Sequence, residues 1–202
     1  MATKNISLAN PQGKASIAIL NDLQSFNPVN VKTKNIPRWL TDLFTSLLVL
    51  SAKFSFKPVI NKEYYLYFDH DQLKLSLIEP HAWRDCPYIF FAACRLHEDK
   101  SWSIEPTNDW ENNHYFLERI NEMRQAFFDA LNTNEPMINS LPYYAGHLPY
   151  HQRVAANGLA KSLRQSLKLE LGTKYSKIIC GKELINIMKN IGHSPLSLLK
   201  QI

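Results

Sequence analysis

Between Phe54 and Pro106, four runs rich in apolar, aromatic and β-branched residues alternate with polar clusters. Short runs of this kind, separated by turn-forming residues at regular intervals, predict an antiparallel sheet of consecutive hairpins. An extended piece at Phe54–Phe56 precedes them, so we expect four or five strands. The four main strands are predicted at Tyr64–Phe68, Leu73–Leu77, Tyr88–Leu96 and Trp102–Ile104.

The third of these runs is apolar on both faces as far as Cys94. Strands with this pattern are usually covered on both sides, so the third strand should be central in the sheet. Leu75 and Phe90 lie in the middle of their strands, and we expect both side chains to be in the core.

Apolar residues recur at helical spacing on either side of this region. Pro37 suits the first turn of a helix, where its missing N–H costs nothing, and Gly172 suits a C-terminal cap. We therefore predict an α+β fold, in which a four- to five-stranded antiparallel meander sheet packs with three to four helices. The helices are expected near residues 37–52, 113–131, 152–171 and 182–190.

The size and composition of the chain suit one core. It has 202 residues, of which 45% are hydrophobic and 20% charged, as in ordinary globular domains. We expect an N-terminal arm at residues 1–35, a central α+β domain at 36–136 and a basic helical region at 137–202 that packs on the same core. No segment approaches the roughly 20 apolar residues of a membrane helix, and the first residues lack the apolar stretch of a signal peptide. These features favour a soluble, cytoplasmic protein without a membrane partner.

The common motifs of catalysis and metal binding do not occur in this sequence. Its three Cys form no CxxC pair, which argues against a disulfide framework or a thiolate zinc site. Its six Gly form no phosphate-binding loop, and neither GxSxG nor HExxH is present. We therefore predict no cofactor and no metal site, name no catalytic residue, and favour a protein that is not an enzyme.

Positive charge is concentrated in the last third of the chain. Residues 137–202 contain nine Lys and Arg against two Glu, a net charge of +7. The other 136 residues contain 14 Lys and Arg against 16 Asp and Glu, a net charge of −2. This asymmetry predicts a binding or adaptor module that meets an anionic partner, either nucleic acid such as RNA or an acidic protein.

The binding residues are expected where an aromatic loop leads into a basic helix. Tyr and His rings of the loop could stack on bases, while Lys and Arg of the helix could meet phosphates. The alternative is that the loop only wedges against the sheet and the basic side chains are merely solvated. The predicted binding residues are Tyr143, Tyr144, Tyr150, His151, Arg153, Lys161, Arg164 and Lys168.

A small enzyme with an acid/base or metal site at one rim of the sheet is the alternative function. If the strands follow chain order, the turns Asp69–Asp71 and His97–Asp99 lie side by side at that rim. Their His and carboxylate side chains could then hold a divalent metal or act as an acid–base pair. The same residues also populate turns simply because turns face water.

Several segments of the central hairpins share a pattern with a known family. They are Phe56–Ile60, Tyr64–Tyr67, Leu75–Pro80 with Trp83, and Leu96 with Trp102. In these residues, over roughly the middle quarter to third of the chain, the sequence resembles the domain-of-unknown-function family 2452. That family has a Gly soon after the Trp, where this chain has Arg84. It has no established activity, so the resemblance implies no function, cofactor or partner.

Overall fold

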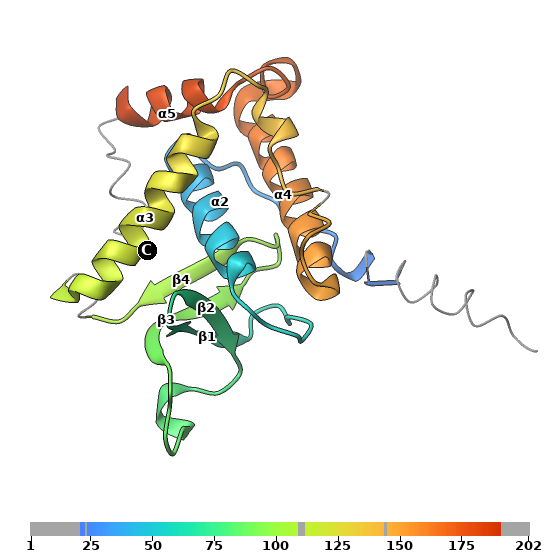
Figure 1. Ribbon diagram of the computed structural model, residues 1–202. Helices are drawn as coiled ribbons and strands as arrows, with labels where there is room; N and C mark the ends of the chain where they lie inside the picture. Colours follow the sequence, from blue (N-terminus) through green and yellow to red (C-terminus); the bar gives the residue numbers. More distant parts are fainter. Residues whose placement is uncertain (1–20, 23, 109–111, 144, 191–202) are drawn as a thin grey trace, which may run out of the picture.

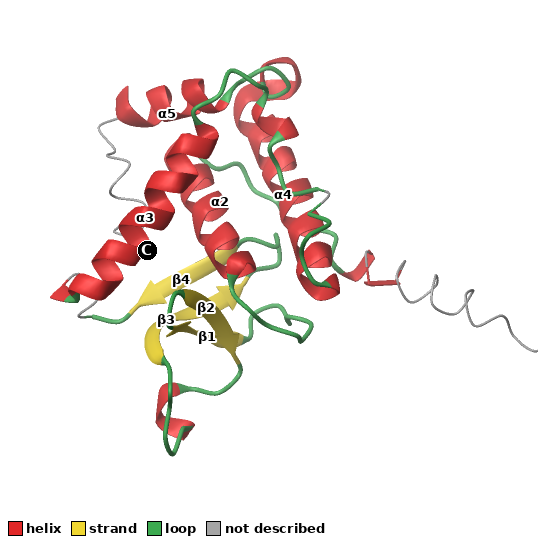
Figure 2. Ribbon diagram, viewed as in Figure 1, coloured by secondary structure: helices red, strands yellow, loops and turns green. Residues whose placement is uncertain are grey.

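The structure is a computed structural model that describes residues 21–22, 24–108, 112–143 and 145–190 (Figure 1). Most of the expected N-terminal arm lies outside the described residues, and so does Tyr144 of the predicted binding residues. The described chain forms an antiparallel sheet with helices packed against it (Figure 2), which confirms the α+β class.

Four strands form the sheet in the described part of the chain, in the order β2-β1-β3-β4. All four lie close to the predicted positions. The extended piece near Phe54 does not become a fifth strand, and only an isolated bridge between Lys53 and Lys74 is present there. The strands are β1 (Glu63–Asp69), β2 (Gln72–Ser76), β3 (Ile89–Leu96) and β4 (Trp102–Pro106).

The strand order differs from chain order, and this changes which turns lie at the same end of the sheet. Because β1 pairs with both β2 and β3, the turn at His70 and the turn at His97 lie at opposite ends of the sheet. The expectation that these two turns share a rim is therefore wrong. The connection between β2 and β3 is long enough to pass along β1 to the other end of the sheet. The third strand can therefore pair with β1 on the edge that β2 leaves free.

This connection, residues 77–88, is held on the open face of the sheet by Tyr67. The Tyr67 hydroxyl donates to the carbonyl of Ile78 at 2.8 Å and accepts from Nε1 of Trp83 at 3.2 Å. Trp83 therefore anchors the connection to the sheet.

The helices begin and end close to the predicted residues. They are α2 (Ile36–Ser51), α3 (His114–Leu131), α4 (Tyr150–Tyr175) and α5 (Gly181–Asn190). Helices α2 and α3 lie on one side of the sheet, α4 lies beside α2, and α5 lies at the end of the helices away from the sheet (Figure 1).

Local sequence explains two of the helix ends. The Asn35 side chain accepts a hydrogen bond from the N–H of Arg38 at 3.0 Å, which satisfies a free donor in the first turn of α2. Pro37 lies in that turn, as expected. Gly172 interrupts α4 with a φ of 79°, a left-handed conformation that glycine adopts without steric cost. The chain therefore changes direction at Gly172.

An irregularity in the pairing of β1 with β3 decides which Phe side chain enters the core. The register shifts by one residue at Phe91, so the alternation of side chains reverses there. Phe91 is fully buried and packs on Phe116 of α3, with ring centroids 5.3 Å apart. Phe90 is only half-buried, beside Tyr67 on the face away from the helices. The prediction that Phe90 is in the core is wrong, whereas the prediction for Leu75 is confirmed.

One buried cluster joins the sheet to all of these helices. It contains Leu66 of β1, Trp39 of α2, Ile120 of α3, Leu163 of α4 and Leu184 of α5. The C-terminal helices therefore share a core with the sheet, and the polar faces that they expose have fixed orientations.

Candidate functional site

Three of the predicted basic side chains lie together on the exposed face of α4. Lys161, Arg164 and Lys168 are spaced i, i+3 and i+7, which places them on one side of a helix, and all three are exposed. Leu163 and Leu167 on the other side are fully buried. Because the core holds the apolar side of α4, the basic side is fixed toward solvent.

A pocket of about 580 Å³ lies against this face and is called here the basic pocket. The turn after Gly172 brings Lys177 to it, and Tyr143 reaches it from the loop before α4. Its full lining is Ile138, Tyr143, Lys161, Arg164, Gln165, Lys168, Thr173, Ser176 and Lys177. None of these described lining residues is Asp or Glu, so four cations meet at a concave surface without a carboxylate to neutralise them.

Tyr143 contributes a buried hydroxyl to the basic pocket. Among the described residues, this hydroxyl has no hydrogen-bond partner of good geometry. Burial raises the pKa of Tyr143, and the neighbouring Arg164 guanidinium partly offsets that rise. The phenol therefore keeps its proton at neutral pH and can donate a hydrogen bond to an anionic oxygen.

A second pocket, of about 660 Å³, adjoins the first and is called here the neutral pocket. Ile138, Tyr143 and Arg164 line both pockets and form the boundary between them. The other residues of the neutral pocket are uncharged or weakly basic, and they are Asn139, Ser140, Leu141, Pro142, Ala145 and His147.

The other predicted binding residues lie at the far end of α4. Arg153 is eight residues before Lys161, which corresponds to about 12 Å along a helix. The Tyr150 hydroxyl donates to a carboxylate oxygen of Asp22 at 2.9 Å, and its ring contacts that of His151. This end of α4 therefore contains a negative charge, and the structure does not bring Tyr150 or His151 into the basic pocket.

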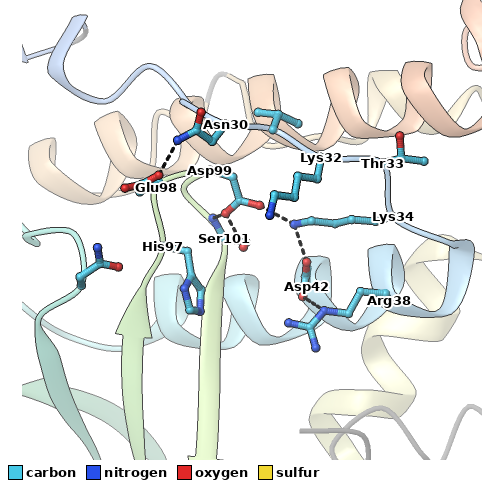
Figure 3. A pocket seen from close by; sticks show the side chains of 12 residues that line it. Asn30, Lys32, Thr33, Lys34, Arg38, Asp42, His97, Glu98, Asp99 and Ser101 are labelled. Atoms are coloured by element: carbon cyan, nitrogen blue, oxygen red, sulfur yellow. Dashed lines mark hydrogen bonds and ion pairs between the residues drawn. The ribbon is translucent and has the colours of Figure 1, made fainter.

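A third pocket, of about 760 Å³, contains ion pairs that were not predicted from the sequence (Figure 3). Lys34 Nζ lies 2.6 Å from Oδ2 of Asp42 in α2 and 2.6 Å from Oδ2 of Asp99 in the β3–β4 turn. Arg38 Nε lies 3.0 Å from Oδ1 of Asp42, whose side chain is 3% exposed. Lys34 therefore ties the segment before α2 to both the helix and the sheet.

The protein pairs both Asp42 and Asp99 of this third pocket with its own cations, and Oδ2 of Asp42 has an ion pair without a hydrogen bond of good geometry among the described residues. Burial would raise the pKa of Asp99, but hydrogen bonds from Lys34 and Ser101 outweigh it and hold the pKa below its usual value. Burial lowers the pKa of His97, whose Nε2 is 2.9 Å from the hydroxyl of Ser103. This arrangement is that of a structural ion network. In contrast, no carboxylate of the described chain forms an ion pair with the four cations of the basic pocket.

The predicted rim site does not assemble, because its two turns lie at opposite ends of the sheet. Within the described ranges, no group of three or more His, Cys, Asp or Glu side chains is placed to hold a metal ion. The Lys34 network could not be predicted from the sequence, because Lys34 and Asp99 are 65 residues apart and no local pattern links them.

No protein-family model matches this chain, and comparisons with curated proteins and with solved structures found no match either. The resemblance of the central hairpins to family 2452 therefore stays a prediction. In the part of the chain that the structure describes, no helix is long and apolar enough to cross a membrane. Function therefore has to be inferred from the chemistry of the sites themselves.

Proposed function

We propose that this protein is a non-catalytic binding module that holds an anionic partner, RNA in the first place, at the basic pocket of α4. The observation that supports this function is the pocket lining, in which Lys161, Arg164, Lys168 and Lys177 meet without an acidic neighbour. Folding accounts for little of this cluster, although Nζ of Lys161 donates a hydrogen bond to Oδ1 of Asn27 at 2.8 Å. Exposed charges contribute little to stability, and like charges held together repel one another.

The row of basic side chains on the exposed face of α4 suits a nucleic-acid strand. Lys161, Arg164 and Lys168 follow one another on one side of α4 over about 10 Å of helix length. The phosphates of a single strand can follow such a line, and Tyr143 and Arg164 offer planar groups on which bases stack. An acidic protein would find the same cations but would make little use of the planar groups.

The test is the salt dependence of RNA binding, measured by fluorescence anisotropy with a labelled single-stranded 12-nucleotide RNA. Each phosphate neutralised on a single strand lowers log K by about 0.7 per tenfold rise in salt. Four cations in the pocket therefore predict a slope of about −2.8 for the wild type. Replacing Lys161, Arg164 and Lys168 together by Gln should weaken binding and reduce the slope to about −0.7.

The matched control replaces two Lys and one Arg elsewhere on the surface, namely Lys53, Lys62 and Arg84, by Gln. These residues are exposed, and their side chains form no ion pair or hydrogen bond in the described structure. The control changes the net charge equally, so it should leave most of the affinity and the slope intact. Equal effects of the two triple variants would refute a localised site. RNA binding that does not respond to salt would refute the proposed function, and competition by polyglutamate as strong as that by unlabelled RNA would assign the pocket to an acidic protein.

A further inference from the structure

We propose that the basic pocket and the neutral pocket together form one site for a nucleoside phosphate, with the phosphate in the first and the base in the second. This inference rests on the proposed function and makes it specific, because it names the chemical group that the site selects.

The basic pocket suits a phosphate monoester better than the diesters within a strand. A monoester carries a charge of about −1.5 to −2 at neutral pH, whereas each internal phosphate carries a single charge. Lys161, Lys168 and Lys177 line the pocket from α4 and from the turn after it, so their charges act on the same concave surface. Thr173 and Ser176 add hydroxyl groups that can hydrogen-bond to phosphate oxygens.

The neutral pocket has the lining that a nucleobase requires. Asn139, Ser140 and His147 provide donors and acceptors for the edges of a base. Leu141 and Pro142 provide apolar wall. The volumes of both pockets, about 580 and 660 Å³, fall within the usual range for small-molecule sites.

The boundary between the pockets connects the two halves of the ligand. Tyr143 and Arg164 line both pockets, so their planar groups lie where the sugar and the base of a nucleotide leave the phosphate. An aromatic ring and a guanidinium can both stack on a base. The buried Tyr143 hydroxyl, which lacks a well-placed partner among the described residues, can donate to a phosphate or ribose oxygen.

A nucleoside monophosphate in this site could be a free nucleotide or the phosphorylated end of an RNA strand. Calorimetry should therefore compare inorganic phosphate, the four nucleoside 5′-monophosphates, and a 12-nucleotide RNA with either a 5′-phosphate or a 5′-hydroxyl. Base stacking is worth about 1–3 kcal/mol, so at least one monophosphate should bind about tenfold more tightly than inorganic phosphate. If the strand end is the ligand, the 5′-phosphorylated RNA should also bind about tenfold more tightly than the 5′-hydroxyl RNA. Equal binding of the two RNAs, together with tight binding of a free monophosphate, assigns the site to free nucleotides.

Two exposed residues separate the roles of the pockets. His147→Ala should lower the preference for a nucleotide over inorganic phosphate, because one hydrogen bond to the base edge is lost, while Lys168→Gln should weaken the binding of both. Both side chains are exposed, so the variants should fold, and a thermal melt checks this. The inference is overturned if no monophosphate binds more tightly than inorganic phosphate and the two RNAs bind equally, or if His147→Ala leaves the preference unchanged. In those cases salt-dependent RNA binding would still uphold the proposed function, whereas the absence of any RNA binding would remove both.

Discussion

Replacing Lys34 by Met should destabilise the protein strongly and reverse the sign of its response to pH. Lys34 Nζ is the cation shared by Asp42 and Asp99, at 2.6 Å from each, and the three side chains are only 12%, 3% and 14% exposed. Met has nearly the same length but no charge. The variant would therefore leave two buried carboxylates close together without their common partner.

The size of the effect follows from what remains around each carboxylate. Asp42 would keep Arg38, whose side chain is 49% exposed, and Asp99 would keep the hydroxyl and N–H of Ser101. Breaking a buried ion pair by removing one partner costs about 3–5 kcal/mol. At an m-value of about 2 kcal/mol/M, this loss lowers the urea midpoint at pH 7 by about 1.5–2.5 M.

The pH response provides the sharper measurement. In the wild type, the pKa of Asp99 is lowered by its partners, so its stabilising effect is lost as the pH falls. In Lys34→Met, Asp99 would lose the hydrogen bond and the charge of Lys34 that help to outweigh its burial, so its pKa should move above that of the unfolded chain. Its protonation would then favour the folded state, and the free energy of unfolding should rise when the pH falls from 7 to 5.

A charge-free variant is the control for this prediction. Combining Lys34→Met with Asp42→Asn and Asp99→Asn removes the unpaired charges, so most of the lost stability should return. A loss of less than about 1 kcal/mol for Lys34→Met, with the pH response of the wild type, would show that the network contributes no more than a surface ion pair.

Three further outcomes are expected. Phe91→Ala should lower the free energy of unfolding by about 3–5 kcal/mol in urea titrations. Phe90→Ala should lower it by only about 1–2 kcal/mol, because its side chain is half-buried. Equal losses would contradict the irregularity in β3. In Gly158→Ala, the new Cβ would lie 2.4 Å from the carbonyl oxygen of Phe26, so the segment before α2 should be displaced and cleaved faster by trypsin, and an unchanged cleavage rate would disprove that close approach. Burial lowers the pKa of His97 from 6.5, so the unfolded state binds more protons just below that pH. The wild type should therefore lose stability between pH 7 and 5. His97→Gln should reduce this loss in thermal melts, and a pH profile identical to that of the wild type would count against the burial effect.

The sequence by itself determined the elements of this fold, because their signals are local. A helix is defined by contacts between residues three and four apart, so the position of Pro37 and the φ preference of Gly172 were sufficient to place the start of α2 and the interruption of α4. The same periodicity placed Lys161 and Arg164 on one exposed face of α4.

Only the tertiary structure decided the order of the strands and which residues make up each site. A strand has two edges that can pair, and the choice of β1 as the neighbour of β3 depends on how residues 77–88 cross the sheet. Lys177 joins the basic pocket because the chain turns at Gly172, and Tyr150 is excluded from it because it lies near the other end of a helix more than 30 Å long (α4 has 26 residues at about 1.5 Å each). The network of Lys34 likewise brings together residues that are distant in sequence, and the buried environment that makes it strong exists only once the chain has folded.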